Sequence, residues 1–177
     1  MEEFKDHIAY VAFGSNLGDK AKNCAEAIHR LHEHSLCELL RVSLLYETEP
    51  LSLPNQKENP WFMNGVLKLK TQLGAAELLN LLREIEQKMG RSPEEEREKW
   101  GPRVIDLDLL FFDKEILKSK TLILPHPELH HRRFVLEPLC EIAPDLIHPL
   151  KGQSVHLLLK NLKDSKKVVP LFNFYRS

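Results

Sequence analysis

The run from Val104 to Phe112 most constrains how this chain can fold. It consists mainly of branched and aromatic residues, and no Gly or Pro interrupts it. Such a run, bounded by turn residues, is typical of a central and largely buried strand. Two carboxylates, Asp106 and Asp108, lie inside it. Because side chains alternate along a strand, these two project from one face about 6 to 7 Å apart, and the apolar residues between and beside them share the other face.

Two carboxylates in an apolar strand suggest a divalent cation site, because buried carboxylates are costly unless they are paired or bound to metal. The pattern leaves one alternative open, a strand with a solvated face on which Asp106 and Asp108 point to water. The residues just upstream favour the cation site. Trp100 offers an aromatic plane and Arg103 a fixed positive charge, and both suit a nucleoside triphosphate with its metal ions.

Hydrophobic periodicity predicts a strand at 8–13, a helix at about 19–35, strands at 36–48 and 61–71, a helix at 75–89 and then the central strand. Strand, helix, strand, strand, helix, strand is the ferredoxin-like βαββαβ order. It predicts an α+β fold with an antiparallel-containing sheet and both helices on one face. Further short helices near 135–143 and 155–162 add C-terminal elements. A chain of 177 residues suits one domain, so residues 1–177 are expected to form a single unit.

The composition excludes several functions. The chain has 25 Lys and Arg against 26 Asp and Glu, which gives no support for broad attraction to nucleic acid or a membrane surface. Its three cysteines form no C-x-x-C pair, and the first residues show no signal sequence, so we expect a reducing, cytoplasmic location. Neither G-x-x-x-x-G-K-[ST] nor G-x-G-x-x-G occurs, which argues against a P-loop or Rossmann nucleotide site.

A second group of polar and aromatic residues lies on the strand at 61–71. Phe62 and Asn64 share one face of it, where a ring can stack on a flat heterocycle and an amide can hydrogen-bond to its edge. The open alternative is a core Phe beside an Asn that satisfies a neighbouring loop. The long polar segment 49–60 resembles a binding loop. Arg91 and Arg103 flank the charged run 91–99, where cations could grip phosphate oxygens.

Five motifs follow one another along residues 8 to 150. They are G-S-N-L-G at Gly14, F-M-N-G at Phe62, G-R at Gly90, W-G-P-R-x-I-D-L-D-L at Trp100 and P-H-P-x-L-x-x-R-x-F at Pro125. In this order they resemble 6-hydroxymethyl-7,8-dihydropterin pyrophosphokinase of folate biosynthesis. The resemblance implies a ferredoxin-like α+β fold, ATP as co-substrate and two Mg²⁺ ions. It also implies transfer of the terminal pyrophosphate of ATP to the pterin hydroxymethyl oxygen, with release of AMP.

The resemblance also assigns residues. It implies that Asp106 and Asp108 bind magnesium, that Asn64 reads the pterin edge, and that Phe62 and Phe134 sandwich the pterin ring. The implied pterin-side loop residues are Thr48, Pro50 and Leu51. The implied nucleotide-side residues, of which Arg91 and Arg103 would be catalytic, are Glu86, Arg91, Trp100, Arg103, Leu109, His126 and Arg132. The chain departs from the common pattern where Phe62 replaces a Tyr and where the loop after Gly90 is slightly longer.

The expected partners are ATP and 6-hydroxymethyl-7,8-dihydropterin, with possible association with neighbouring folate-pathway enzymes and with neither nucleic acid nor membrane. Phosphoryl transfer is catalysed mainly by positioning and charge stabilisation and not by a covalent intermediate on the protein, so no nucleophilic side chain is predicted. The main alternative is a ferredoxin-like module whose sheet aromatics stack on nucleic-acid bases. The neutral charge balance and the two strand aspartates count against it. A regulatory domain that binds a small molecule without catalysis is a third possibility, and AMP formation separates it from an enzyme.

Overall fold

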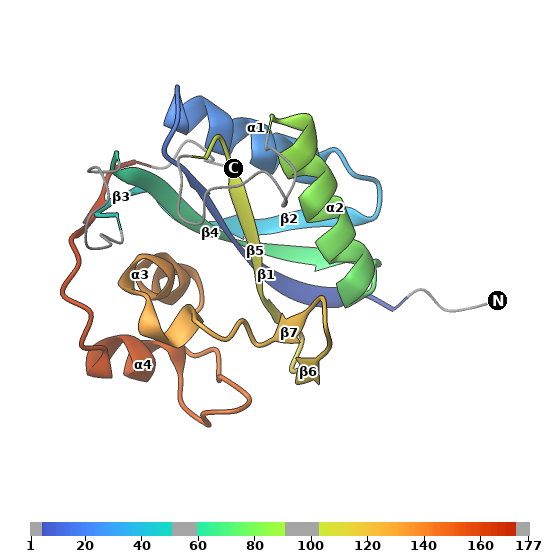
Figure 1. Ribbon diagram of the computed structural model, residues 1–177. Coiled ribbons are helices and arrows are strands. Elements are labelled where there is room, and N and C mark those ends of the chain that lie inside the picture. The colour runs from blue at the N-terminus through green and yellow to red at the C-terminus, as the bar shows by residue number, and fades with distance from the viewer. Residues whose placement is uncertain (1–4, 51–59, 91–102, 173–177) are drawn as a thin grey trace.

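The computed structural model describes residues 5–50, 60–90 and 103–172. Within them, the chain forms an antiparallel sheet with helices on both faces (Figure 1). The strand order is β5-β1-β4-β3-β8, and β2 also pairs with β4. These strands are β1 (His7–Ser15), β2 (Cys37–Val42), β3 (Tyr46–Thr48), β4 (Phe62–Thr71), β5 (Asp106–Phe112) and β8 (Val168–Pro170). The strands β6 (Leu117–Lys118) and β7 (Ile123–Leu124) form a separate small hairpin.

Helices α1 (Lys20–His32) and α2 (Ala75–Lys88) cover one face of the sheet (Figure 1). The carboxylate of Asp19 accepts a hydrogen bond from the backbone N–H of Lys22 at 3.0 Å and so caps α1. Both helices contribute to one apolar cluster with the inward side chains of the sheet. Its members include Val11, Phe13, Ile28, Leu31, Leu67, Leu69, Leu78, Leu82, Leu107 and Leu109. This confirms the predicted α+β fold and the shared face of the two helices.

Helix α3 (Arg133–Ile142) packs on the opposite face, and α4 (Val155–Asn161) packs against α3 (Figure 1). Their cluster includes Tyr10, Val66, Leu110, Phe111, Leu129, Leu136, Leu139 and Leu158. On β1 and β4 this cluster reaches Ala12 and Val66 but does not include Gly14 and Asn64, which lie further along the same face. The C-terminal elements therefore cover part of this face and leave the polar end of it outside the apolar core.

Two parts of the sheet differ from the prediction. The strand predicted at 36–48 is divided into β2 and β3, because Ser43 leaves the strand to pair with Val66: its backbone N–H donates to Val66 O at 2.9 Å, and its hydroxyl accepts from Val66 N at 3.0 Å. The strand β8 was not predicted at all. It is too short for a period-2 pattern, and it contains Pro170, which is tolerated only at a sheet edge.

No helix among the described residues has the length and apolar character needed to cross a membrane.

Candidate active site

Three residues from three neighbouring strands form a row across the polar end of the sheet. Gly14 on β1 lies opposite Asp106 on β5 and opposite Asn64 on β4. Residues directly opposite each other in antiparallel strands point to the same face. Since neighbouring strands lie about 4.8 Å apart, the backbones of Asp106 and Asn64 are roughly 10 Å apart. Gly14 has no side chain, so no side chain of β1 separates the carboxylate from the amide in this row.

The amide of Asn64 lies directly over Gly14. A Cβ atom added to Gly14 would be 2.1 Å from Asn64 Oδ1. On its other side, Asn64 Nδ2 donates a hydrogen bond to Thr48 Oγ1 on β3, and both residues are buried. The amide is therefore held between two strands. A structural partner for Asn64 is also what the alternative interpretation expected, so its contact with a pterin stays a prediction.

The acidic end of the row is tied to the segment before β5. Arg103 Nη1 donates to Asp106 Oδ2 at 2.8 Å, and about a quarter of each side chain is exposed. Arg103 is itself held through its backbone, because Arg103 N donates to Asn16 Oδ1 at 2.6 Å and Asn16 N donates to Arg103 O at 3.0 Å. The turn after β1 thus fixes a guanidinium beside the first strand aspartate.

The aspartates and leucines of β5 alternate as predicted. Asp106 and Asp108 are partly exposed, whereas Leu107 and Leu109 are buried in the cluster under α1 and α2. From that side, Glu86 on α2 is 4% exposed and accepts a hydrogen bond from the backbone N–H of Leu107 at 2.7 Å. Because β5 is the outermost strand in the order, this N–H has a side chain rather than another strand as its acceptor. Glu86 therefore holds the backbone between the two aspartates.

A third group of residues reaches the site from the segment between β7 and α3. His126 N donates to Leu110 O at 2.9 Å, which places this segment along the outer edge of β5. Burial lowers the pKa of His126, the positive charge of Arg132 lowers it further, and the nearby charges of Glu128 and Asp106 oppose both effects. His126 Nδ1 accepts from Glu128 N at 3.2 Å, so the neutral ring carries its proton on Nε2.

Arg132 and Phe134 lie together at the start of α3. The guanidinium carbon of Arg132 is 5.8 Å from the ring centroid of Phe134, within the range of a cation–π contact. Phe134 is partly buried, and Phe62 at the start of β4 is partly buried as well. Phe62 lies opposite Thr48 in the pairing of β3 with β4, and it precedes Asn64 by two residues on the same face of β4.

Some predicted residues cannot be placed. Leu51, Arg91 and Trp100 lie outside the described residues, as do most of the two segments expected to form binding loops. Pro50 lies two residues after the end of β3 and is partly buried. The buried side chains of Glu86 and Leu109 belong to the face covered by α1 and α2, and their contacts with a nucleotide stay predictions.

Sequence reasoning missed two residues that shape the site. Gly14 and Asn16 belong to the G-S-N-L-G motif, but their use depends on strand register and on a contact 87 residues away along the chain. Asn16 is 3% exposed, and its Nδ2 group has no hydrogen-bond partner in the described part of the chain. Within the same residues, no group of three or more His, Cys, Asp or Glu side chains could hold a metal ion.

Comparison with known proteins assigns the chain to a family. Residues 10–144 match the model of the 7,8-dihydro-6-hydroxymethylpterin-pyrophosphokinase (HPPK) family. The chain belongs to this family. It is similar to the 2-amino-4-hydroxy-6-hydroxymethyldihydropteridine pyrophosphokinase of Bacillus subtilis, with 42% identity over 138 residues that cover 78% of this chain and 79% of the relative. The match confirms the family that the five motifs resemble.

Other relatives of this HPPK family member are much longer. The chain is 39% identical to the folic acid synthesis protein fol1 of Schizosaccharomyces pombe over 178 residues, which cover 95% of this chain but 24% of that protein. Its fold resembles the crystal structure of wild-type Plasmodium falciparum HPPK-DHPS, with a TM-score of 0.71 and 17% identity over 90% of this chain and 45% of that chain. The chain thus spans a quarter to a half of these longer proteins.

Proposed function

We propose that this chain transfers pyrophosphate from ATP to 6-hydroxymethyl-7,8-dihydropterin and releases AMP. The observation that carries the proposal is the row of Asp106, Gly14 and Asn64 across the sheet. It provides a donor and acceptor group at one end and negative charge at the other, with a glycine between them. A flat heterocycle on the amide side would hold its hydroxymethyl group toward the acidic side.

The pterin would be bound by Asn64 at its polar edge and by the rings of Phe62 and Phe134 on its faces. An asparagine amide suits such an edge because it offers both a donor and an acceptor. The bond from Asn64 to Thr48 supports this role, since an amide that is already oriented loses less entropy on binding. Pro50 and Leu51 would line the same side of the ring.

The phosphates of ATP would lie on the acidic side, near Arg103, His126 and Arg132. Asp106 and Asp108 fit Mg²⁺ in the manner in which this ion is usually bound, through one or two carboxylates and substrate phosphates and not through an all-protein cage. This agrees with the lack of a larger ligand cluster among the described residues. When bound, the ions would offset the negative charge of the phosphates. Arg91 and Trp100 would complete the nucleotide side.

In the proposed reaction, the pterin hydroxymethyl oxygen forms a bond to the β-phosphorus of ATP. The bond from this phosphorus to the oxygen that bridges it to the α-phosphorus breaks, AMP leaves with that oxygen, and the proton of the hydroxymethyl group is released to water. Since such transfers depend on alignment and charge stabilisation, the residues need only hold the two substrates in line. A role of Arg103 in this alignment is supported by the Asn16 contacts to its backbone and by the hydrogen bond from its guanidinium to Asp106.

The test is a single-turnover reaction with ATP, Mg²⁺ and the pterin alcohol, separated by chromatography. The expected products are AMP and a pterin diphosphate in equal amounts. ADP together with a pterin monophosphate, or no pterin-dependent turnover, would overturn the proposal. The long relatives add a second proposal, that this pyrophosphokinase unit works in association with another folate-pathway enzyme. Crosslinking of the purified chain with candidate folate enzymes, followed by mass spectrometry, tests it.

A further inference from the structure

The C-terminal segment 163–170 contacts both sides of the proposed site. One end of it meets the first turn of α3, and the other end forms β8 beside β3. Helix α3 begins directly after Arg132 and carries Phe134, whereas β3 carries Thr48. The segment therefore joins two elements that contribute proposed substrate contacts and that are 85 residues apart in the sequence, from Thr48 to Arg133.

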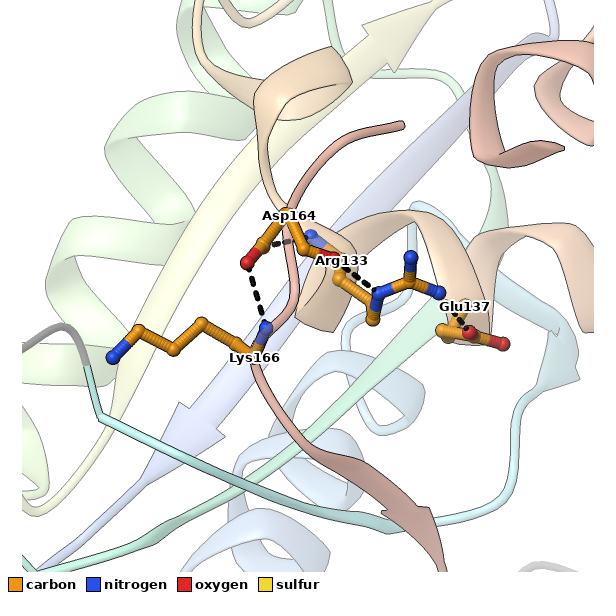
Figure 2. Close-up of polar contacts among 4 residues, drawn as sticks. All are labelled: Arg133, Glu137, Asp164 and Lys166. Atoms are coloured by element: carbon orange, nitrogen blue, oxygen red, sulfur yellow. Dashed lines mark hydrogen bonds and ion pairs between the residues drawn. The ribbon is translucent and has the colours of Figure 1, made fainter. Parts of the chain in front are cut away.

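Asp164 caps α3 from a distance of 31 residues along the chain. The N-cap position of this helix is occupied by Arg132, whose side chain makes no cap hydrogen bond. Instead, Asp164 Oδ2 accepts from the backbone N–H of Arg133 at 2.9 Å, and Oδ1 accepts from Lys166 N at 3.0 Å (Figure 2). A carboxylate at this position satisfies a backbone donor that the helix leaves unpaired and interacts favourably with the helix dipole.

Arg133 strengthens the same junction. Its Nε donates to the backbone oxygen of Asp164 at 2.7 Å, and its Nη1 donates to Glu137 Oε1 at 3.0 Å, as Figure 2 shows. The guanidinium of Arg133 is thus bound to the C-terminal segment and to its own helix. The two consecutive arginines therefore make different contacts. Arg133 binds the C-terminal segment, whereas Arg132 lies beside the ring of Phe134.

The other end of the segment is attached to β3. Lys166 Nζ lies 3.3 Å from Glu49 Oε1, and the backbone of Lys167 exchanges hydrogen bonds with Glu49 at 3.0 and 3.1 Å. From there β8 pairs with β3 in antiparallel register, with Val168 opposite Thr48. The strand that holds the Thr48 hydroxyl beneath Asn64 is therefore bonded to the same segment that caps α3.

We infer that Asp164 is a positioning residue for the pterin site, which acts by fixing the first turn of α3 and so the ring of Phe134. This inference rests on the proposed function, because it assumes that the rings of Phe62 and Phe134 enclose the pterin. Asp164 itself touches no substrate in this scheme. Its loss would allow the start of α3 to loosen, and a less populated binding-competent state raises the apparent dissociation constant.

The test compares Asp164→Ala with Ser154→Ala. Ser154 caps α4 through a hydrogen bond from Leu157 N at 3.2 Å and is not among the proposed site residues, so it is a matched control for the loss of one helix cap. Loss of a cap typically costs about 0.5–2 kcal/mol, which corresponds to about a 2- to 30-fold change in an equilibrium. We expect Asp164→Ala to raise the pterin KM by about 2- to 30-fold with kcat within about twofold, and Ser154→Ala to leave the pterin KM unchanged.

Asp164→Asn provides a second variant, because its single amide oxygen can still accept from Arg133 N. It should give an intermediate pterin KM, and it serves as the decisive variant if Asp164→Ala does not fold. An unchanged pterin KM in a folded variant that melts at a lower temperature would overturn the inference, as would an equal rise in Ser154→Ala. Wild-type protein without pterin-dependent AMP formation would instead overturn the proposed function, so the two failures are distinguishable.

Discussion

Replacement of Gly14 by Ala offers a direct test of the proposed pterin side. The new Cβ would lie 2.1 Å from Asn64 Oδ1, whereas an ordinary contact begins at 3.4 Å, so the amide oxygen would have to move by about 1.3 Å, the difference between the two distances. The other neighbours are farther away, at 3.2 Å for Asn64 Cγ and 3.7 Å for Met63 O. The substitution thus acts mainly on one side chain.

The size of the effect follows from the burial of Asn64. Asn64 is 9% exposed and Thr48 is 1% exposed, so a displaced amide cannot replace its lost hydrogen bond with free water. A buried polar group left unsatisfied costs about 1–3 kcal/mol. If pterin binding requires the amide to return to its position beside Thr48, the binding free energy of the pterin is weakened by the same amount. We therefore expect about a 5- to 150-fold rise in the pterin dissociation constant.

The assay is pterin and ATP binding by calorimetry, arranged as a double-mutant cycle with Asn64→Ala. If Gly14→Ala acts through Asn64, its effect on pterin affinity should almost vanish in the Asn64→Ala background, because the displaced group is already gone. ATP affinity should change less than pterin affinity in both variants. Additive losses of pterin affinity would refute the reasoning, and so would an unchanged pterin dissociation constant in a folded Gly14→Ala protein.

Two further predictions concern the site, and a third concerns His130 in the short 3-10 helix Leu129–His131 before α3. Asp106→Asn and Asp108→Asn should each lower turnover at least about 10²- to 10³-fold while the fold survives, and near-normal rates across a magnesium titration would remove that residue from the metal site. Phe62→Ala should weaken pterin binding by about 5- to 150-fold and spare ATP, since stacking on one ring is worth roughly 1–3 kcal/mol; equal loss of both affinities would mean that Phe62 is structural. Burial and nearby positive charge lower the pKa of His130 to about 4, so the folded state disfavours the protonated imidazole. Neutral His130 therefore contributes to the free energy of unfolding above pH 6.5, and this contribution is lost as the pH falls toward 4. In melting curves, the midpoint of His130→Gln should fall less between pH 7 and pH 5 than the midpoint of the wild type.

The sequence predicted those parts of the fold that follow from local patterns. The alternation of Asp106 and Asp108 with buried leucines is a period-2 signal, and it holds in β5. The stripes of α1 and α2 likewise predicted which side of each helix is buried, and the βαββαβ order predicted that both helices share one face of the sheet. In each case the neighbouring residues in the chain carry the information, so no knowledge of long-range pairing was needed.

The parts that the sequence did not predict depend on register and on distant partners. Nothing local in Gly14 shows that it faces both Asp106 and Asn64, because two independent strand pairings produce that row. Similarly, the three residues of β8 are too few for a pattern, and their pairing with β3 is supported by Glu49, more than 115 residues away. The division of 36–48 at Ser43 has the same origin, since the hydroxyl pairs with Val66 on another strand.

The geometry of Glu86 shows how a predicted site residue can act from the opposite side of a sheet. The backbone N–H of Leu107 lies between the two aspartates on the outermost strand, and a buried donor there needs an acceptor. A carboxylate is well suited because it accepts without donating. Any shift of this peptide would change the spacing of Asp106 and Asp108, which alternate about it on the other face. Glu86 thus supports the acidic end of the row from the apolar core, just as Thr48 supports the amide end from β3.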